Sequence, residues 1–368
     1  MMDRIESIKS LFGFGSNGKK ITDAAANKCV RFLEKSKMDT SGCAEIVGYC
    51  YALCNGAPSV DYVLQVCELY AKRGLLSFDD IHNNIPLQET NFYPRKEVTT
   101  ALFVQEMCNT TANMYRLGWD ERNGGNVSYL LDEQQVAEYL DLNKVIRTIP
   151  LMGVNEVDFD VTPLLGKIFI VTGTGKYFKN VKDDPENNLG IVRIVKDGVE
   201  LLWGFADGGR PTSEFPAHMM SHMARLAVDP EHRVVMHCHP THTLAMNYVH
   251  ELDERKFTHT LWEMCTECIV VFPDGVGILP WMLCGTSEIG KATANKMKDF
   301  RLVVWSMHGI YGAGKTLDET FGLIETVEKA AQIYILTCNR PRLNTITDAQ
   351  LKQLAEFFKV DYRKDFLD

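Results

Sequence analysis

Residues 190–204 read GIVRIVKDGVELLWG, two short apolar stretches on either side of Asp197-Gly198. An Asp-Gly pair between such stretches is a strong short-range signal for a β-hairpin, because its residues adopt the backbone conformations of a tight two-residue turn. The stretch therefore predicts two antiparallel strands, in a sheet that is at least partly antiparallel.

Further β-rich runs lie on both sides of this hairpin. They read KIFIVTG (167–173), RVVMHCH (233–239), CIVVF (268–272) and RLVVWSMHG (301–309). Helical apolar periodicity lies between and after them, at 213–227, 286–299, 316–338 and 347–358. Alternating strands and helices of this kind predict a layered α/β domain with a mixed or antiparallel sheet.

The first 95 residues read differently. Amphipathic helices are predicted at 24–36, 42–54 and 59–73. The stretch DIHNNIPLQETNFYPRK (80–96) has two prolines, three asparagines and no periodicity, which predicts a linker. We therefore expect residues 1–95 to form a small all-α module with its linker. A second domain, residues 96–368, should begin with a helix at 98–117.

The composition is that of a soluble globular protein, with 45% hydrophobic and 24% charged residues. A net charge of −9 argues against nucleic acid or an anionic membrane as a partner. No apolar run approaches the roughly 18–20 residues that span a bilayer, and the start MMDRIESIKSLFGFG does not resemble a signal peptide. The eleven cysteines follow no regular framework, so we expect a cytoplasmic location.

Three histidines lie within VVMHCHPTHT (234–243). His237 and His239 are two residues apart at the end of a strand and should point to the same side. His308 ends another β-run, so two strand ends could bring three imidazoles together. Three histidines with one open position are typical of catalytic zinc sites. We choose His308 as the third ligand; His242 is nearer in sequence, but it should lie in the first turn of the following helix.

Two further stretches could bind an anion. ERNGGNVS (121–128) has two glycines between Asn123 and Asn126, where backbone amides could converge on a phosphate. RPTSEFPAH (210–218) places Thr212 and Ser213 at a predicted helix N-terminus, with Glu214 in the first turn, where the helix dipole favours a carboxylate. Taken alone, each stretch is also compatible with an ordinary turn or helix cap.

Residues 309–316 match the phosphate-loop pattern, from Gly309 to Gly314, Lys315 and Thr316. Only helices are predicted after this match, so no later strand could supply a magnesium-binding aspartate. We interpret the segment as a glycine-rich bend next to His308.

Taken together, residues 98–338 resemble the class II, zinc-dependent aldolase family, and within it the enzymes that cleave rhamnulose 1-phosphate. The motifs that carry the resemblance are GWDERNGGN (118–126), IVTGTGKYF (170–178), PTSEFPAH (211–218), VMHCH (235–239), LWEMCTECIVVFPDGVGILPWM (261–282) and LDETFGLIETVEKAAQ (317–332). The resemblance implies a three-layer α/β/α sandwich with a largely antiparallel central sheet, and a homotetramer.

The resemblance also implies roles for individual residues. His237, His239 and His308 would bind one Zn²⁺ per subunit, with His242 outside the ligand set. Glu214 would be the catalytic carboxylate, and Glu267 would enter the site of a neighbouring subunit. Thr174 stands where the family has serine. The residues implied for phosphate binding are Asn123, Gly125, Asn126, Thr174, Thr212 and Ser213.

The implied reaction is the reversible cleavage of L-rhamnulose 1-phosphate to dihydroxyacetone phosphate and L-lactaldehyde, in rhamnose catabolism. Residues 96–368 would be the catalytic domain. The resemblance says nothing about residues 1–95, because the family begins near the helix at 98. Two alternatives remain: another class II enzyme, such as fuculose-1-phosphate aldolase or ribulose-5-phosphate 4-epimerase, and a non-catalytic scaffold whose N-terminal helices bind a partner.

Overall fold

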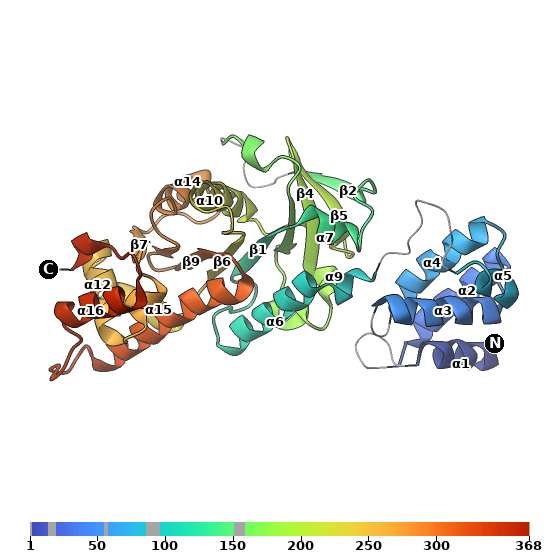
Figure 1. The fold of residues 1–368 in the computed structure, drawn as a ribbon, viewed down its shortest axis with the longest axis horizontal. Coiled ribbons are helices and arrows are strands. Elements are labelled where there is room, and N and C mark those ends of the chain that lie inside the picture. The colour runs from blue at the N-terminus through green and yellow to red at the C-terminus, as the bar shows by residue number, and fades with distance from the viewer. Residues whose placement is uncertain (1, 14–19, 55–57, 86–95, 151–158, 368) are drawn as a thin grey trace. The chain divides into compact units, whose positions relative to one another are not determined.

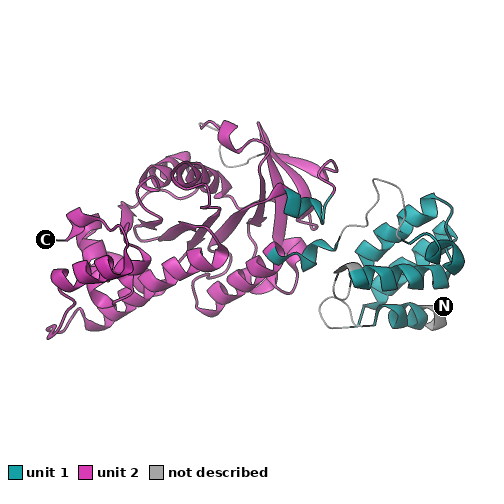
Figure 2. Ribbon diagram, in the orientation of Figure 1, with its two compact units in different colours: residues 1–102, 134–140 teal, residues 103–133, 141–368 magenta. Residues whose placement is uncertain are grey.

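The computed structural model describes residues 2–13, 20–54, 58–85, 96–150 and 159–367. The chain forms two compact units (Figure 2): residues 1–102 with 134–140, and residues 103–133 with 141–368. The expected division between residues 95 and 96 lies close to this one, but the exact boundary stays a prediction.

The first unit contains the helices that precede the sheet. Helices were expected at 24–36, 42–54 and 59–73, and all three are present. The described helices are α1 (Met2–Phe12), α2 (Asp23–Ser36), α3 (Thr40–Cys54), α4 (Val60–Lys72) and α5 (Phe78–His82). Their apolar faces form one core, in which Cys29, Cys43, Ile46, Val63 and Tyr70 are completely buried.

Helix α5 corrects the predicted linker at 80–96. Ser77 and Asp80 form a reciprocal capping box that begins this helix, and Ile81 anchors it in the core. The prediction was therefore wrong for the first residues of the segment. Residues 86–95 lie outside the described part of the chain.

The second unit is built on a nine-stranded sheet with the order β2-β5-β4-β3-β1-β6-β9-β8-β7. Every neighbouring pair is antiparallel except β7 and β8, which confirms the largely antiparallel sheet. The strands are β1 (Asn126–Leu131), β2 (Arg147–Pro150), β3 (Ile168–Thr172), β4 (Leu189–Val195), β5 (Gly198–Gly204), β6 (Val234–Cys238), β7 (Val276–Leu279), β8 (Leu302–Trp305) and β9 (Gly309–Gly314).

The hairpin at 190–204 is confirmed, but its turn lies one residue earlier than the predicted Asp197-Gly198. Strands β4 and β5 pair in antiparallel register up to Val195 and Gly198, so Lys196 and Asp197 form the two-residue turn and Gly198 begins β5. A bulge between Ile191 and Val192 shifts the register farther along. Bulges of this kind increase the local twist of a sheet.

Helices cover both faces of the sheet (Figure 1). Helices α10 and α14 lie on one face, while α15, α12 and α16 lie on the other, which makes three layers. The remaining helices of the chain are α6 (Leu102–Arg116), α7 (Glu133–Ala137), α8 (Phe178–Val181), α9 (Pro185–Asn188), α10 (Phe215–Val228), α11 (Thr241–Val249), α12 (Glu254–Met264), α13 (Cys268–Val271), α14 (Ser287–Lys296), α15 (Leu317–Thr337) and α16 (Asp348–Phe358), with 3₁₀ turns at Val98–Thr100, Thr162–Leu164 and Lys364–Phe366. Of these, the turn Val98–Thr100 and nearly all of α7 are grouped with the first unit. No helix in the described ranges is long and apolar enough to cross a bilayer.

Three local predictions were wrong. The helix expected at 98–117 begins as the 3₁₀ turn Val98–Thr100, and α6 starts only after Ala101. CIVVF (268–272) forms the short helix α13 rather than a strand, an ambiguity that periodicity cannot resolve in so short an apolar run.

The third error concerns residues 309–314, which form strand β9 rather than a glycine-rich bend. The strand pairs with β6 on one side and β8 on the other. A Cβ on Gly312 would lie only 2.9 Å from the Ile324 side chain of α15, so glycine lets the helix pack closely on the strand. The backbone N–H groups of a central strand donate hydrogen bonds to the two neighbouring strands, so they are not free to bind a phosphate. This excludes the phosphate-loop interpretation.

Two glycines with the same backbone conformation give a test of this packing. Gly204 and Gly208 both have φ +86°, but a Cβ on Gly204 would overlap the Leu189 carbonyl, whereas a Cβ on Gly208 meets nothing within 4 Å. We expect Gly208→Ala to cost about 1 kcal/mol, from the left-handed backbone alone. Gly204→Ala should cost about 3 kcal/mol, because the steric overlap adds to this. Urea denaturation measures both; equal losses would show that β4 and β5 separate without strain.

Candidate metal centre and active site

The candidate site is built around strand β6, which lies between β1 and β9. In the antiparallel pairing of these strands, His237 is opposite Asn126 of β1 on one side and Tyr311 of β9 on the other. Opposed residues of antiparallel strands project from the same face of a sheet. Three neighbouring strands therefore contribute one row of polar side chains, with His237 in the middle.

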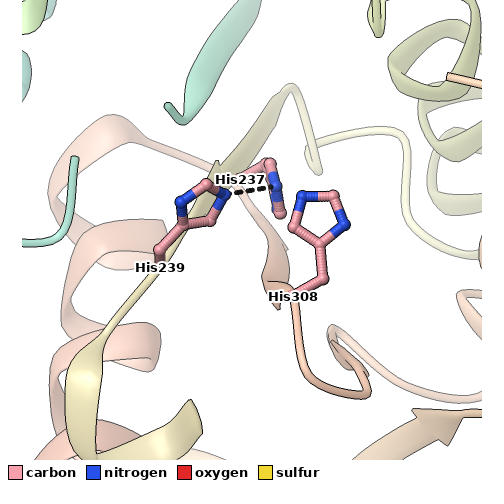
Figure 3. Close-up of side chains that lie close together, drawn as sticks. All are labelled: His237, His239 and His308. Atoms are coloured by element: carbon pink, nitrogen blue, oxygen red, sulfur yellow. Dashed lines mark hydrogen bonds between the residues drawn. The ribbon is translucent and has the colours of Figure 1, made fainter. Parts of the chain in front are cut away.

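Three imidazoles converge at the end of this row (Figure 3). His239 directly follows β6, and His308 closes the turn from β8 to β9, where its backbone N–H donates to the Trp305 carbonyl at 3.0 Å. One ring nitrogen from each of His237, His239 and His308 lies within 4.8 Å of the other two. His242 points elsewhere: its Nδ1 is 2.8 Å from the Glu328 carboxylate.

The hydrogen bonds of these rings leave nitrogen lone pairs facing one another. His237 donates Nδ1–H to the Ile310 carbonyl at 3.1 Å, and His239 donates Nδ1–H to the Glu121 carboxylate at 2.9 Å. In the neutral form of each ring the lone pair is then on Nε2, and the two Nε2 atoms lie 3.3 Å apart. Two lone pairs at this distance repel unless a cation lies between them. Ligands about 2.0–2.1 Å from a tetrahedral zinc are spaced about 3.3 Å apart, so the spacing of this pair fits such an ion, and His308 lies close enough to supply a third nitrogen.

Burial favours the neutral form of His237 and His308. It holds the pKa of His237 well below its usual range, and repulsion between a proton on this ring and protons on His239 or His308 lowers it further. Burial, followed by the same repulsion from His239, lowers the pKa of His308 to about 4. Both rings are therefore unprotonated at neutral pH, which is the form that binds metals.

Glu214 lies beside the imidazoles. Its Oε2 is 3.8 Å from His237 Nε2 and accepts hydrogen bonds from Asn126 Nδ2 at 2.9 Å and from the Tyr311 hydroxyl at 3.1 Å. Burial raises the pKa of this carboxyl, and the hydrogen bonds from Asn126 and Tyr311 oppose the rise. Desolvation is the larger of these effects on the carboxyl. The expectation that the helix N-terminus favours the ionised form of Glu214 stays a prediction.

The start of α10 also differs from the expected anion site. The helix begins at Phe215 with Glu214 as its N-cap, so Thr212 and Ser213 precede it. The Thr212 hydroxyl already accepts a hydrogen bond from the Glu214 N–H, and its carbonyl accepts one from the Phe215 N–H. Pro216 has no backbone N–H. The helix N-terminus therefore has few free donors, and Ser213 contributes an exposed side chain instead.

The structure brings the other predicted phosphate-binding segments to this region. An isolated bridge pairs Gly173 with Pro211, and the Thr174 N–H donates to the Arg210 carbonyl at 2.9 Å. The turn that carries Thr174 therefore lies next to the segment that carries Thr212 and Ser213.

The glycine loop at 121–126 is shaped by its close approach to His239. A Cβ on Gly124 would lie 2.9 Å from the His239 ring, and one on Gly125, at φ +72°, would overlap the Asp120 carboxyl. Asn123 is exposed on this loop. The amide of Asn126 is buried, however, and bonds Glu214 and His218 rather than facing outwards.

Glu267 is separate from this group. It lies at the exposed start of α13, where its carboxylate accepts a hydrogen bond from the Cys265 thiol at 2.8 Å. In the described part of the chain, no contact joins it to the three imidazoles.

Two residues of the site were not predicted from the sequence. Glu121 orients His239 through a hydrogen bond to its Nδ1. It is the first residue of the ERNGGN motif, and a carboxylate beside a predicted anion-binding loop was the sequence signal that could have identified it. Tyr311 stacks on His237 with ring centroids 4.5 Å apart and bonds Glu214. No sequence signal identifies it, because its role depends on the pairing of β6 with β9.

Known proteins with similar sequences are aldolases. Residues 105–335 match the family model of the class II aldolase and adducin N-terminal domain. A rhamnulose-1-phosphate aldolase of Listeria monocytogenes serotype 4a (strain HCC23) is 60% identical over 276 residues, covering 74% of this chain and 99% of the relative. The Escherichia coli O81 (strain ED1a) rhamnulose-1-phosphate aldolase is 48% identical over 271 residues, covering 72% and 96%.

A solved structure supports the fold as well. The sugar-phosphate aldolase of Thermotoga maritima superposes with a TM-score of 0.55 at 26% identity, covering 66% of this chain and 97% of the other. The family match spans more than half of the chain, and the relatives are matched over nearly their whole length. The chain therefore belongs to the class II aldolase family.

Proposed function

We propose that this chain is a zinc-dependent lyase that reversibly cleaves L-rhamnulose 1-phosphate to dihydroxyacetone phosphate and L-lactaldehyde in rhamnose catabolism. One observation carries the proposal. His237, His239 and His308 converge beside Glu214, in a chain 60% identical to a rhamnulose-1-phosphate aldolase.

The three imidazoles would hold one Zn²⁺ per subunit. Metal binding here is supported by the Nε2 atoms of His237 and His239, which lie 3.3 Å apart. In both rings the Nδ1–H already donates a hydrogen bond, so Nε2 is the nitrogen left for a metal. Zinc bound there would act as a Lewis acid on the carbonyl and hydroxyl oxygens of the substrate, stabilising negative charge that develops at C3.

Glu214 would transfer the proton at C3 of dihydroxyacetone phosphate. Its Oε2 is held by Asn126 and Tyr311 at the edge of the metal centre. Burial raises the pKa of the carboxyl, which makes the carboxylate a better proton acceptor.

The phosphate would bind at the loops around Glu214, through residues that do not take part in bond cleavage. Binding energy from this remote group would orient the reacting carbons. Asn126 lies at the border of the set, because its amide already bonds Glu214 and His218. The proposed residues are Asn123, Gly125, Asn126, Thr174, Thr212 and Ser213.

We expect the purified protein to cleave L-rhamnulose 1-phosphate faster than L-fuculose 1-phosphate, and to contain about one zinc per chain. A chelator should abolish cleavage, and added Zn²⁺ should restore it. Coupled detection of dihydroxyacetone phosphate and elemental analysis of the same sample provide the measurements. Faster cleavage of the fuculose ester would favour that aldolase, epimerisation of ribulose 5-phosphate would favour the epimerase, and inactivity towards all three would favour a scaffold.

A matched pair of histidine variants provides the control. His308→Ala removes one of the convergent nitrogens and should lose the metal. His242→Ala should retain it, because that ring bonds Glu328 instead. Metal retained by the first variant and lost by the second would show that the wrong third ligand was chosen.

Glu214→Gln keeps the size of the side chain and removes the proposed base. Turnover should fall by roughly two to four orders of magnitude, the usual contribution of a positioned acid–base group. KM should change much less, because the lost interaction belongs to the transition state. Exchange of the C3 proton of dihydroxyacetone phosphate with solvent deuterium isolates this step. Exchange at the parent rate would rule out Glu214 as the base.

We further propose a homotetramer in which Glu267 acts in the neighbouring subunit. Glu267 is exposed, and its described hydrogen bond is with Cys265 rather than with the three histidines of its own chain. Large apolar side chains are also exposed after the paired ends of β7 and β8: Met307 precedes His308 and is 39% exposed, and Trp281 follows β7 and is 66% exposed. Exposed apolar groups of this kind favour an interface.

Complementation tests the shared site. Glu267→Ala and His308→Ala should each inactivate the protein, but co-expression should restore activity. In randomly mixed tetramers, about a quarter of the sites combine an intact His308 with an intact Glu267 from the neighbour. If Glu267 acted within its own subunit, every mixed site would carry one defect and activity would stay absent. Light scattering should give four times the 41.6 kDa of one chain.

We expect this chemistry in the cytoplasm. All ten cysteines whose side chains the structure describes are free thiols, as in reducing compartments. Cell fractionation tests this, and recovery of the protein outside the cell would contradict it.

A further inference from the structure

A second row of polar side chains runs away from the metal centre beneath Glu214. Glu214, His218 and His222 are spaced four residues apart along α10 and its N-cap, so they share one face of the helix. Asn126 and Ser128 are two residues apart on β1 and share one face of the strand. The two rows lie against each other and are joined by hydrogen bonds.

These hydrogen bonds form one continuous chain. Asn126 Nδ2 donates to Glu214 Oε2 at 2.9 Å, and the other end of the same amide, Oδ1, bonds His218 Nε2. Ser128 Oγ lies 2.8 Å from His218 Nδ1 and 2.8 Å from His222 Nε2. Ser128, His218 and His222 are completely buried. The chain is therefore shielded from solvent along its whole inner part.

The direction of the first bonds follows from the carboxylate. Glu214 Oε2 accepts from both the Tyr311 hydroxyl and the Asn126 amide, so it carries no proton. The NH₂ group of Asn126 therefore faces Glu214, and its carbonyl oxygen faces His218. Because that oxygen can only accept, His218 Nε2 must be the donor.

The remaining bonds are then determined as well. Burial lowers the pKa of His218 to about 3 and that of His222 well below its usual range, so each ring carries one proton at neutral pH. His218 Nδ1 must accept the Ser128 hydroxyl, and Ser128 Oγ must accept Nε2–H from His222. The chain ends at His222 Nδ1, a buried atom without a hydrogen-bond partner in the described structure. An unpaired acceptor at this end agrees with the direction deduced from Glu214.

We infer that His218 is a positioning residue that orients the Glu214 carboxylate through Asn126. Rotation of the Asn126 amide by 180° would turn its carbonyl oxygen towards Glu214 Oε2 and replace an attraction with a repulsion. The Nε2–H of His218 prevents this rotation, and Ser128 and His222 hold His218 in the required tautomer. The inference rests on the proposed function only in treating Glu214 as the base.

Both histidines also pack against aromatic rings. His222 lies 4.9 Å from Phe169 and His218 lies 5.5 Å from Tyr311, measured between ring centroids. Replacing either histidine therefore changes the core as well as the hydrogen bonds. The experiment has to separate loss of orientation from loss of stability.

Two variants of His218 make this separation. His218→Gln can place an amide N–H near the position of Nε2 and keep the donor to Asn126. His218→Asn is shorter, so it can keep the contact with Ser128 but cannot reach Asn126. We expect His218→Gln to exchange the C3 proton of dihydroxyacetone phosphate within about threefold of the parent rate. His218→Asn should be about 10–100-fold slower, with KM and zinc content unchanged, as for other groups that act through a neighbour.

Crystal structures of the two variants provide a readout that does not depend on activity. The distance from Glu214 Oε2 to His237 Nε2, 3.8 Å in the parent, should be kept in His218→Gln and changed in His218→Asn. In an Asn126→Ala background, the difference in exchange rate between the two variants should disappear, because the connection through Asn126 is already broken.

Equal exchange rates in the two variants, or a difference that persists with Asn126→Ala, would overturn the inference. If His218→Asn does not fold, Ser128→Ala provides the test. It removes the hydroxyl that donates to His218 Nδ1, so the proton of His218 is no longer held on Nε2. Slower exchange at unchanged KM is then expected, and the parent rate would overturn the inference. Failure of the proposed function is distinguishable, because the parent itself would then exchange no proton, while the crystallographic comparison would still test the orientation of Glu214.

Discussion

The site depends on the register of β6 against its two neighbours. Antiparallel pairing with β1 and β9 sets Asn126, His237 and Tyr311 side by side on one face of the sheet. A shift of one residue in either pairing would turn the partner side chain to the opposite face. His237 would then lose its stacking with Tyr311, and Glu214 would lose one of its two hydrogen-bond donors. The candidate metal centre is therefore a consequence of strand pairing as much as of its three histidines.

Helix α10 adds the second element of this arrangement. It packs over β6 and β9 and brings Glu214 to the row of polar side chains. The same helix face continues into the core with His218 and His222, so the candidate base is connected to a rigid, buried part of the protein. Burial has two opposing effects here: it raises the pKa of Glu214 through desolvation, and it makes the hydrogen bonds that orient the carboxylate stronger.

Small residues make this packing possible. Gly124 lets the loop lie against the His239 ring, and Gly312 lets α15 approach β9. The glycines of β9 look like a phosphate loop in the sequence, but here they admit neighbouring side chains into a central strand. The same composition thus has two interpretations, and only the position of the segment in the sheet distinguishes them.

Sequence alone determined the class of the fold and most of the candidate site. The Asp-Gly hairpin, the apolar runs and the helical periodicity predicted a layered α/β domain with a mixed or antiparallel sheet, because these signals arise from local backbone preferences and burial patterns. The motifs around His237, Glu214 and Asn123 were readable for the same reason: their residues are close together along the chain. The choice of His308 over His242 also agrees with the geometry.

Only the tertiary structure decided what depends on contacts between distant segments. The strand at 309–314, the helix at 268–271 and the start of α10 are set by packing that no local pattern records. The roles of Glu121 and Tyr311 arise from partners 118 and 97 residues away in sequence. The pKa of Glu214 could not be predicted from sequence for the same reason. A helix N-terminus can be predicted from sequence, but the desolvation that raises this pKa depends on everything that folds around the carboxyl group.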